Sequence, residues 1–554
     1  MSNGKKRIKG LQRGRPIDDV ALAEIRSLLG EDTRRRDLLI EYLHRIQDRF
    51  GCISDAHCVA LADELALSST EVYEVATFYH HFDVIKDDEQ RPPAVTVRVC
   101  ESVSCALFGA ADLLESLKDS LGPTVRVQPV PCVGRCDTAP VAVVGSNPIA
   151  GASVESVSAA VHAQALQAPP TQHLAYEEYC RDGGYDLLRE CHRGARKPDD
   201  VVEALQNSNL RGLGGAGFPA GTKWSILRDQ PAPRLIAVNI DEGEPGTFKD
   251  RVYLEQDPYR FIEGMLIAAW AIAATGCYIY IRDEYTGCRR ALEKEIQELQ
   301  ANPPCQLPLI ELRRGAGAYI CGEESAMIES IEGKRGLPRL RPPYVAQIGL
   351  FGRPTLEHNM ETLHWVRDIV QRGPEWFSSH GRRERKGLRS FSVSGRVNNP
   401  GVHLAPAGIS VRELIDEYCD GMLEGHEFYG YFPGGASGGI LPASIGDEAL
   451  DFDTLQPHGC FIGSAAVIIL SNQDSARDAA LNAMRFFEHE SCGQCTPCRV
   501  GTAKAVDLMK NDRWDTDLLE ELARVMEDAS ICGLGQAAPN PLRCAIKYFP
   551  QEFN

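Results

Sequence analysis

The sequence predicts a multi-domain α/β protein with helical regions at both ends. Its 554 residues are 43% hydrophobic and 25% charged, enough apolar sequence to bury several cores in about three to five domains. Strand-like and helix-like segments alternate through the middle of the chain, as they do in α/β folds. Near both ends the apolar residues instead recur with helical spacing. We therefore expect a chain that is folded over most of its length.

Charge and composition exclude several classes of function. The formal net charge of -18 argues against nucleic acid as a partner, because phosphate binding requires a basic face. The basic start from Lys5 to Arg15 lacks a following apolar core, so it predicts a flexible arm and no secretory signal. The uncharged stretch 264–281 reads as a helix followed by a strand, and we expect no membrane span. A cytoplasmic protein is expected, whose 19 cysteines bind metal or are buried rather than forming disulfides.

The N-terminal third divides into a helical part and an α/β part. Leu38, Leu39, Tyr42, Leu43 and Ile46 have roughly helical spacing, and Ser68-x-x-Glu71 resembles a capping box, which predicts an arm and helical bundle over residues 1–90. A strand ending at residue 100, a helix over 106–121 and strands over 125–130 and 141–144 predict a compact α/β unit over residues 91–165. Residues 166–175, rich in Ala, Gln and Pro, predict a linker.

Three further regions are expected after the linker. A glycine-rich α/β region covers residues 176–385, a short β-rich module covers 386–450, and a helical region covers 451–554.

The first cysteine group consists of Cys100-x4-Cys105 and Cys132-x3-Cys136. Each pair directly follows a predicted strand, so two neighbouring loops can bring four thiolates together. Four thiolates suit a tetrahedral zinc ion or a [2Fe–2S] cluster, and the spacing favours the cluster because zinc sites prefer C-x2-C knuckles. Four unrelated buried thiols are the remaining alternative.

The second cysteine group is Cys492-x2-Cys495-x2-Cys498. This spacing is typical of a loop that binds three corners of a [4Fe–4S] cluster. The fourth ligand must come from elsewhere in the chain. Cys532 is the preferred candidate because its neighbouring glycines let the backbone approach an inorganic core, and Cys544, in a helix-like tail, is the alternative.

A glycine-rich segment and an acidic segment predict a nucleotide site. Gly212-x-Gly214-x-x-Gly217 matches the dinucleotide fingerprint, but the residues before it look helical, whereas the fingerprint requires a strand. The loop still offers unobstructed N–H groups to a phosphate, together with Lys223. The carboxylates between Asn239 and Arg251 follow a predicted strand over 235–238. They either form a solvated turn or hold ribose hydroxyls, which would favour NAD over NADP.

Five segments together carry a family resemblance: residues 212–224, 239–251, 315–324, 332–336 and 492–498. They resemble the flavin- and NADH-binding subunit of respiratory complex I and its soluble relatives, the diaphorase subunits of NAD-reducing hydrogenases and NAD-dependent formate dehydrogenases. Residues up to about 165 resemble the small [2Fe–2S] subunit of complex I, here fused to the larger one.

The resemblance implies a fold and a set of cofactors. It implies a thioredoxin-like [2Fe–2S] domain over 91–165, an FMN- and NAD-binding α/β domain over 176–385 and a helical [4Fe–4S] domain over 451–554. The module over 386–450 resembles a β-grasp and is assigned no chemistry. The resemblance further places eight cysteines on the two clusters: Cys100, Cys105, Cys132 and Cys136 on [2Fe–2S], and Cys492, Cys495, Cys498 and Cys532 on [4Fe–4S].

The resemblance also assigns residues to the two nucleotides. Asp283 and His358 stand where the family has glycine and asparagine, and Ile226 replaces an aromatic residue. Glu242 and Glu244 are expected to position the reactants, because hydride transfer to a flavin requires no protein acid or base. The residues implied for FMN are Gly212, Gly214, Gly215, Ala216, Lys223, Asn239, Asp241, Glu242, Tyr280, Asp283, Glu284, His358, Asn359 and Thr362, and those for NAD are Phe218, Glu244 and Tyr344.

The expected function is electron transfer between iron–sulfur clusters and NAD+ or NADH through FMN. Fusion of the two modules argues against ordinary complex I, where they are separate chains. Retention of all four cysteines in the first group favours a formate dehydrogenase, whose catalytic subunit carries molybdenum or tungsten and further clusters, over a hydrogenase module. A zinc-binding scaffold and a flavoprotein reductase without electron-transfer partners are the alternatives of a different class.

Overall fold

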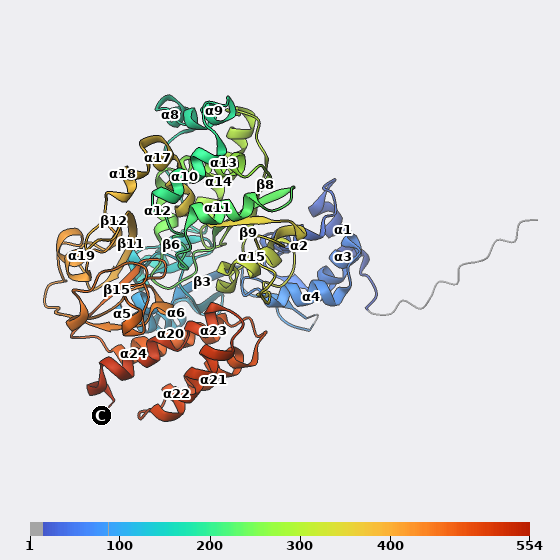
Figure 1. Cartoon of the computed structure of the whole chain (residues 1–554). Helices are drawn as coiled ribbons and strands as arrows, with labels where there is room; N and C mark the ends of the chain where they lie inside the picture. Colours follow the sequence, from blue (N-terminus) through green and yellow to red (C-terminus); the bar gives the residue numbers. More distant parts are fainter. Residues whose placement is uncertain (1–14, 87, 554) are drawn as a thin grey trace, which may run out of the picture. The chain divides into compact units, whose positions relative to one another are not determined.

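The computed structural model describes residues 15–86 and 88–553. Most of the predicted basic arm therefore lies outside the described residues. The chain divides into two compact units, one formed by the N-terminal residues to Pro92 together with Ser330–Arg335, the other by the rest of the chain. Figure 1 shows the elements along the chain.

The first unit is helical, as predicted. It contains α1 (Asp19–Leu29), α2 (Leu39–Phe50), α3 (Asp55–Leu65) and α4 (Ser69–Phe78), with a short parallel pair, β1 (Ile53–Ser54) and β2 (Val84–Ile85). Of the five apolar residues predicted with helical spacing, Leu39, Tyr42, Leu43 and Ile46 are buried in α2, whereas Leu38 precedes the helix and is only partly buried. Ser68 and Glu71 form the capping box of α4. The segment Ser330–Arg335 joins this unit through the Tyr79 hydroxyl, which donates to the Lys334 carbonyl (2.8 Å) and forms a second hydrogen bond with Ser330 Oγ (2.9 Å).

The second unit begins with a thioredoxin-like domain. Its elements are β3 (Val95–Cys100), α5 (Val103–Leu107), α6 (Ala110–Leu121), β4 (Val125–Val130), β5 (Ala142–Val144), β6 (Asn147–Ile149) and α7 (Val154–His162). The sheet order is β4-β3-β5-β6, in which only the β3–β4 pair is parallel. The prediction of a single helix over 106–121 is wrong, because the structure has two helices, α5 and α6, separated at Gly109. Gly109 has φ +80°, a left-handed conformation that interrupts an α-helix and that glycine adopts readily.

A parallel sheet forms the middle of the second unit, in the order β10-β7-β8-β9. The strands are β7 (Arg234–Ile240), β8 (Ala274–Ile281), β9 (Leu309–Arg314) and β10 (Thr355–Asn359). The helices of this region are α8 (Tyr176–Arg181), α9 (Asp186–His192), α10 (Pro198–Asn207), α11 (Ala220–Arg228), α12 (Lys249–Gln256), α13 (Tyr259–Ala271), α14 (Thr286–Ala301), α15 (Glu324–Ile331), α16 (Met360–His364), α17 (Val366–Arg372) and α18 (Pro374–Ser378).

The strand order of this sheet reverses between β7 and β10. Open α/β sheets bind ligands outside the carboxyl ends of their strands at such a point. The uncharged stretch 264–281 is the end of α13 followed by β8, as predicted. Among the residues described, no helix combines the length and apolar character needed to cross a bilayer.

A mixed five-stranded sheet follows, in the order β12-β11-β15-β13-β14. It contains β11 (Leu388–Gly395), β12 (Gly401–Pro406), α19 (Val411–Tyr418), β13 (Phe428–Phe432), β14 (Leu441–Pro442) and β15 (Ala466–Ser471). The predicted module end at residue 450 would cut this sheet before its central strand, β15. Every residue of β15 is buried, so the strand lacks the polar–apolar alternation that reveals half-exposed strands.

Five helices complete the chain and are drawn in red tones in Figure 1. They are α20 (Ala476–Glu490), α21 (Thr496–Met509), α22 (Thr516–Ala529), α23 (Gly533–Ala537) and α24 (Asn540–Tyr548).

Candidate functional site

A cavity of about 870 Å3 lies at the carboxyl edge of the parallel sheet. Its walls include the glycine loop at 214–216, the acidic segment 241–244 after β7, and Asn359 at the end of β10. The strand register pairs Asn239 of β7 with Asn359 of β10, so the cavity opens at the point where strand order reverses. Residues of the five-stranded sheet region and of the C-terminal helices close the other side.

The glycine loop follows helix α10, as the sequence indicated, and is therefore not a Rossmann turn. Its shape is held by the Gly212 amide donating to the Phe218 carbonyl (2.8 Å). Gly215 has φ +131°, and a side chain built there would meet only the backbone of Gly463, at 3.9 Å. The loop thus presents bare backbone to the cavity, which is what close approach of a phosphate or flavin requires.

The acidic wall consists of Asp241, Glu242 and Glu244. Burial raises the pKa of all three carboxyls, that of Glu242 to about 7 with a further contribution from Asp250. Asp241 Oδ2 is buried without a hydrogen-bond partner. A buried acceptor without a donor is costly, so a hydroxyl-bearing ligand such as the ribityl chain of FMN fits this wall.

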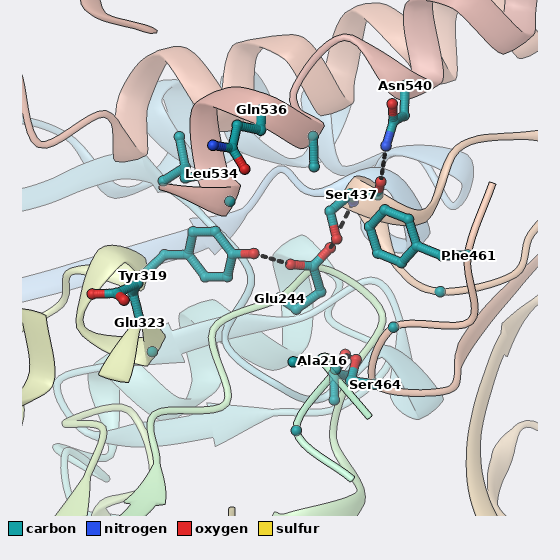
Figure 2. A pocket seen from close by; sticks show the side chains of 18 of the residues that line it. Ala216, Glu244, Tyr319, Glu323, Ser437, Phe461, Ser464, Leu534, Gln536 and Asn540 are labelled. Atoms are coloured by element: carbon teal, nitrogen blue, oxygen red, sulfur yellow. Dashed lines mark hydrogen bonds between the residues drawn. The ribbon is translucent and has the colours of Figure 1, made fainter. Parts of the chain in front are cut away.

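Glu244 is held in place from two sides of the cavity. One carboxylate oxygen accepts hydrogen bonds from the Ser437 amide (2.7 Å) and hydroxyl (2.8 Å), and the other accepts from the Tyr319 hydroxyl. Asn540 of α24 in turn donates to the Ser437 carbonyl (3.0 Å). Figure 2 shows this chain of contacts running across the cavity. The arrangement fixes a carboxylate where it can accept hydrogen bonds from a nucleotide.

A buried lysine adjoins the acidic wall. Lys249 Nζ lies 2.7 Å from Asp250 Oδ1, 3.1 Å from Glu361 Oε2 and 3.3 Å from Asn359 Oδ1. Burial disfavours its charge, but the carboxylates of Asp250, Glu361 and Glu242 outweigh burial and raise the pKa of Lys249. The Asp250 and Arg251 amides donate to the two carboxylate oxygens of Glu242. This lysine therefore compensates the negative charge gathered at the cavity.

The structure brings together only part of the predicted nucleotide set. The predicted residues that line the cavity are Gly214, Gly215, Ala216, Asn239, Asp241, Glu242, Glu244 and Asn359. Those that do not line it are Gly212, Phe218, Lys223, Tyr280, Asp283, Glu284, Tyr344, His358 and Thr362.

The two departures from the family pattern at flavin positions, Asp283 and His358, both have partners outside the cavity. Asp283 forms an ion pair with Arg314 (2.5 Å). His358 is buried and accepts a hydrogen bond from Trp224 Nε1 (2.8 Å), and burial and then the charge of Lys223 hold its pKa well below the ordinary value. This hydrogen bond joins α11, which carries Trp224, to β10, which carries His358.

Other predicted residues do not line the cavity but have partners elsewhere in the fold. Thr362 Oγ1 accepts from the Leu213 amide (2.9 Å) and so supports the glycine loop, while Lys223 pairs with Glu357 (3.1 Å). Glu284 pairs with Arg282 (3.0 Å). Phe218 and Tyr344 are 47% and 55% exposed, so each leaves about half of its surface open to solvent.

Several cavity residues carried no prediction. Lys249, Asp250 and Tyr319 lie within segments that resemble the family but were given no role. Ser437 belongs to the module assigned no chemistry, and Ser464 belongs to the region predicted as the [4Fe–4S] domain, where neither residue was given a role. The hydroxyl pair Thr247–Ser464 (2.6 Å) joins that C-terminal region to the acidic segment. No spacing rule in the sequence signals a serine that meets a glutamate 193 residues away.

The first cysteine group converges in the thioredoxin-like domain. All four thiols are buried, and Cys132 Sγ lies 3.3 Å from Cys136 Sγ. Hydrogen bonds of Cys100 with Cys105 and Cys132 raise the pKa of the Cys100 thiol, whereas hydrogen bonds from Cys100 and Cys136 lower that of Cys132. The four buried thiols are therefore close enough to form hydrogen bonds with one another. Such a set fits a cationic metal centre, which binds cysteines as thiolates after their protons are released.

The second cysteine group lines one small cavity. Cys492, Cys495, Cys498 and Cys532 all border it, together with Ser491 and Leu534, whereas Cys544 does not. A side chain added at Gly535 would come within 2.8 Å of Cys498 Cβ, which explains the glycine beside the fourth cysteine. The donor set fits a [4Fe–4S] cluster and favours Cys532 as the fourth ligand.

Direct contacts connect the cavity to both cysteine groups. Arg282 donates to the Cys132 carbonyl (2.6 Å) and to the Glu242 carbonyl. Tyr319 makes the second connection, and its hydroxyl binds Glu244. The Tyr319 amide donates to Glu490 Oε2 (2.9 Å), two residues before Cys492. Residues of the cavity wall therefore contact segments that carry both cysteine groups.

The raised pKa of Glu242 predicts a pH-dependent stability. The ordinary value of 4.5 rises to about 7 in the folded chain, so this carboxyl favours folding below about pH 4.5 and the gain is lost as pH rises through 7. The shift corresponds to at most about 3 kcal/mol. Glu242→Gln should lose less stability than the natural chain between pH 5.5 and 8 in urea unfolding. Glu115→Gln, on an exposed part of α6, is the control, and an unchanged pH profile in Glu242→Gln would refute the assignment.

Three family models match the chain. They are the Nuo51 FMN-binding domain over residues 205–368, the NADH-ubiquinone oxidoreductase-F iron-sulfur binding region over 478–554, and the thioredoxin-like [2Fe-2S] ferredoxin over 25–165. These matches agree with the cavity and with both cysteine groups, and they decide between zinc and iron–sulfur for the first group.

Curated relatives match the larger part of the chain. An NADH-quinone oxidoreductase subunit of Rhizobium meliloti (strain 1021) is 41% identical over 399 residues, which cover 69% of this chain and 94% of that protein. The mitochondrial NADH-ubiquinone oxidoreductase 51 kDa subunit of Neurospora crassa is 40% identical over 375 residues, which cover 64% of this chain and 76% of that protein.

Solved structures match nearly the whole chain. A chain of NAD+-reducing [NiFe]-hydrogenase in the H2-reduced state superimposes with a TM-score of 0.81 at 31% identity, covering 94% of this chain and 92% of that one. The air-oxidized state gives a TM-score of 0.82 at 30% identity, covering 94% of both chains.

Proposed function

The chain belongs to the family of the 51 kDa subunit of NADH-ubiquinone oxidoreductase, and from this membership we propose that it passes electrons between NAD(H) and iron–sulfur clusters through FMN within a larger enzyme. The observation that carries the proposal is a nucleotide-sized cavity whose wall residues contact the segments of both cysteine groups. FMN, when bound, supplies the exchange between the paired electrons of a hydride and the single electrons that the clusters carry.

The chain's own residues have binding and positioning roles in this proposal. The bare backbone at 214–216 receives the flavin nucleotide, and Asp241 accepts a hydroxyl donor. Glu244, held by Tyr319 and Ser437, accepts hydrogen bonds from the nicotinamide nucleotide. Lys249 compensates the charge of the acidic wall. None of these side chains transfers a proton that hydride transfer requires, so their effect is on binding and orientation.

Glu244→Gln tests this assignment. Loss of one charged hydrogen-bond acceptor is expected to cost about 1.5–3 kcal/mol, equivalent to roughly a 10- to 100-fold fall in kcat/KM for NADH with ferricyanide as acceptor. The unmodified chain, purified without oxygen, should be brown, release FMN and show two distinct cluster signals in EPR after reduction. Glu115→Gln serves as the control. Iron-free chain containing zinc would sink the proposal in favour of a zinc-binding scaffold.

We further propose that the electron donor is a formate-oxidising catalytic subunit with molybdenum or tungsten and further iron–sulfur clusters, so that the chain reduces NAD+. The fused N-terminal region argues against an ordinary complex I, where the two modules are separate chains, and the four cysteines of the first group favour a formate dehydrogenase over a hydrogenase. An NAD-reducing hydrogenase module is the second candidate, supported by the likeness to the hydrogenase chain over 94% of this chain.

Metal analysis of the native complex separates the two candidates. The tagged chain is captured from its source cells under anaerobic conditions together with its partners. Molybdenum or tungsten at about one per complex, with formate-dependent reduction of NAD+, is the expected result. Nickel with hydrogen-dependent reduction would instead establish the hydrogenase module.

A further inference from the structure

Two cysteines outside the cluster sites form a close pair on the wall of the large cavity. Cys460 and Cys544 are 84 residues apart in sequence, and their sulfur atoms lie 3.4 Å apart. Cys460 belongs to the loop before β15 and Cys544 to α24, and both line the cavity. Both are buried in the fold, at 2% and 3% exposure.

The space around the pair is kept by a glycine. Gly439, at φ +85°, faces both sulfur atoms, and a side chain there would come within 2.6 Å of Cys460 Sγ and 3.0 Å of Cys544 Sγ. Any residue with a Cβ atom would therefore push the thiols apart. The pair is also distinct from the cluster ligands, because the small cavity of the second cysteine group contains Cys532 and not Cys544.

The surroundings make the two thiols unequal. A hydrogen bond from Cys460 lowers the pKa of Cys544 against the effect of burial, aided by the Ile440 amide and the charges of Lys547 and Arg543. The hydrogen bond to Cys544, followed by burial, raises the pKa of Cys460. A thiolate beside cationic side chains, with a second thiol in contact, is the arrangement of reactive cysteine pairs.

We propose that Cys460 and Cys544 form a reversible thiol–disulfide exchange site that reacts with small disulfides entering the cavity. The Cys544 thiolate attacks one sulfur of the disulfide RSSR, which releases RS− and forms Cys544–S–SR. Cys460 then gives up its proton and attacks Cys544 Sγ, which forms the Cys460–Cys544 bond and releases the second RS−. Two protein thiols are oxidised and one RSSR is reduced to two RSH.

Closure of this disulfide requires a small movement. The sulfur atoms must approach from 3.4 Å to about 2.05 Å. The bond ties α24 to the cavity loop, and α24 also carries Asn540, which holds Ser437 and through it Glu244. The exchange itself depends only on the two cysteines, so it is independent of the function proposed above.

The test uses the full-length, cluster-loaded chain and hydroxyethyl disulfide under anaerobic conditions, followed by alkylation, digestion and mass spectrometry. We expect a peptide pair linked through Cys460 and Cys544, which disappears after dithiothreitol treatment, with unchanged iron content. Cys460→Ser should instead accumulate the mixed disulfide on Cys544. In Cys544→Ser, modification of Cys460 should be at least tenfold slower.

A control and two contrary outcomes complete the design. Cys305→Ser, at a partly exposed thiol elsewhere, should form the linked pair at the natural rate. Alkylation of both cysteines despite excess disulfide would overturn the proposal. So would a linked pair that appears only in chain that has lost iron, because the pair would then arise from unfolding.

Discussion

Cys532→Ala should remove the four-iron cluster while leaving the two-iron cluster in place. Cys532 borders the same small cavity as Cys492, Cys495 and Cys498, and a cubic cluster requires a ligand at each iron. We expect iron to fall from about six to about two atoms per chain. Iron analysis and EPR of the reduced chain measure this change, in which the signal of the four-iron cluster disappears.

Cys544→Ala is the matched control for this experiment. Cys544 is also a C-terminal cysteine, but its sulfur lies beside Cys460, away from the three-cysteine loop. The variant should keep its full iron content. Loss of four irons from Cys544→Ala, with retention in Cys532→Ala, would show that the fourth ligand has been assigned to the wrong cysteine.

Lys249→Met should strongly destabilise the chain. The substitution keeps the approximate side-chain volume but leaves Asp250 and Glu361 buried without their cation. Breaking a buried ion pair from one side typically costs about 3–5 kcal/mol. Urea unfolding at neutral pH measures the loss.

Lys223→Met tests whether the stability loss expected for Lys249→Met depends on burial of the ion pair or only on removal of a positive charge. Lys223 also has carboxylate partners, Glu357 at 3.1 Å and Glu324 at 3.8 Å, but its side chain is 23% exposed. Partly solvated pairs contribute about 0–1 kcal/mol, so this variant should unfold near the natural midpoint. Equal destabilisation by both substitutions would contradict the role given to burial at Lys249.

Local patterns were sufficient for most of the fold. The helical face of α2 and the capping box of α4 depend on residues three or four positions apart, and the strands preceding each cysteine pair depend on short apolar runs. The end of the β-rich module was misplaced because β15, although a short apolar run, has no alternation that links it to this sheet. It is buried throughout and pairs with strands 36 to 74 residues earlier in the chain.

Part of the candidate site could also be predicted from local sequence, and the rest required the tertiary structure. The cysteine groups could be predicted because a cluster's ligands are close in sequence, but the choice between Cys532 and Cys544 required the packing of α23 and α24. Asp283 and His358 matched flavin positions by motif, yet their side chains bind Arg314 and Trp224. A motif places a residue on the chain, whereas its partners depend on which elements pack beside it.

The sequence by itself determined the multi-domain α/β class, the three-cysteine loop, the convergent first cysteine group and the acidic segment after β7, because each depends on spacing within one or two elements. Only the tertiary structure decided that Ser437 and Tyr319 hold Glu244, that Lys249 compensates the acidic wall and that Cys460 meets Cys544. These contacts join segments about 70 to nearly 200 residues apart, and such distant side chains meet only through the packing of whole domains.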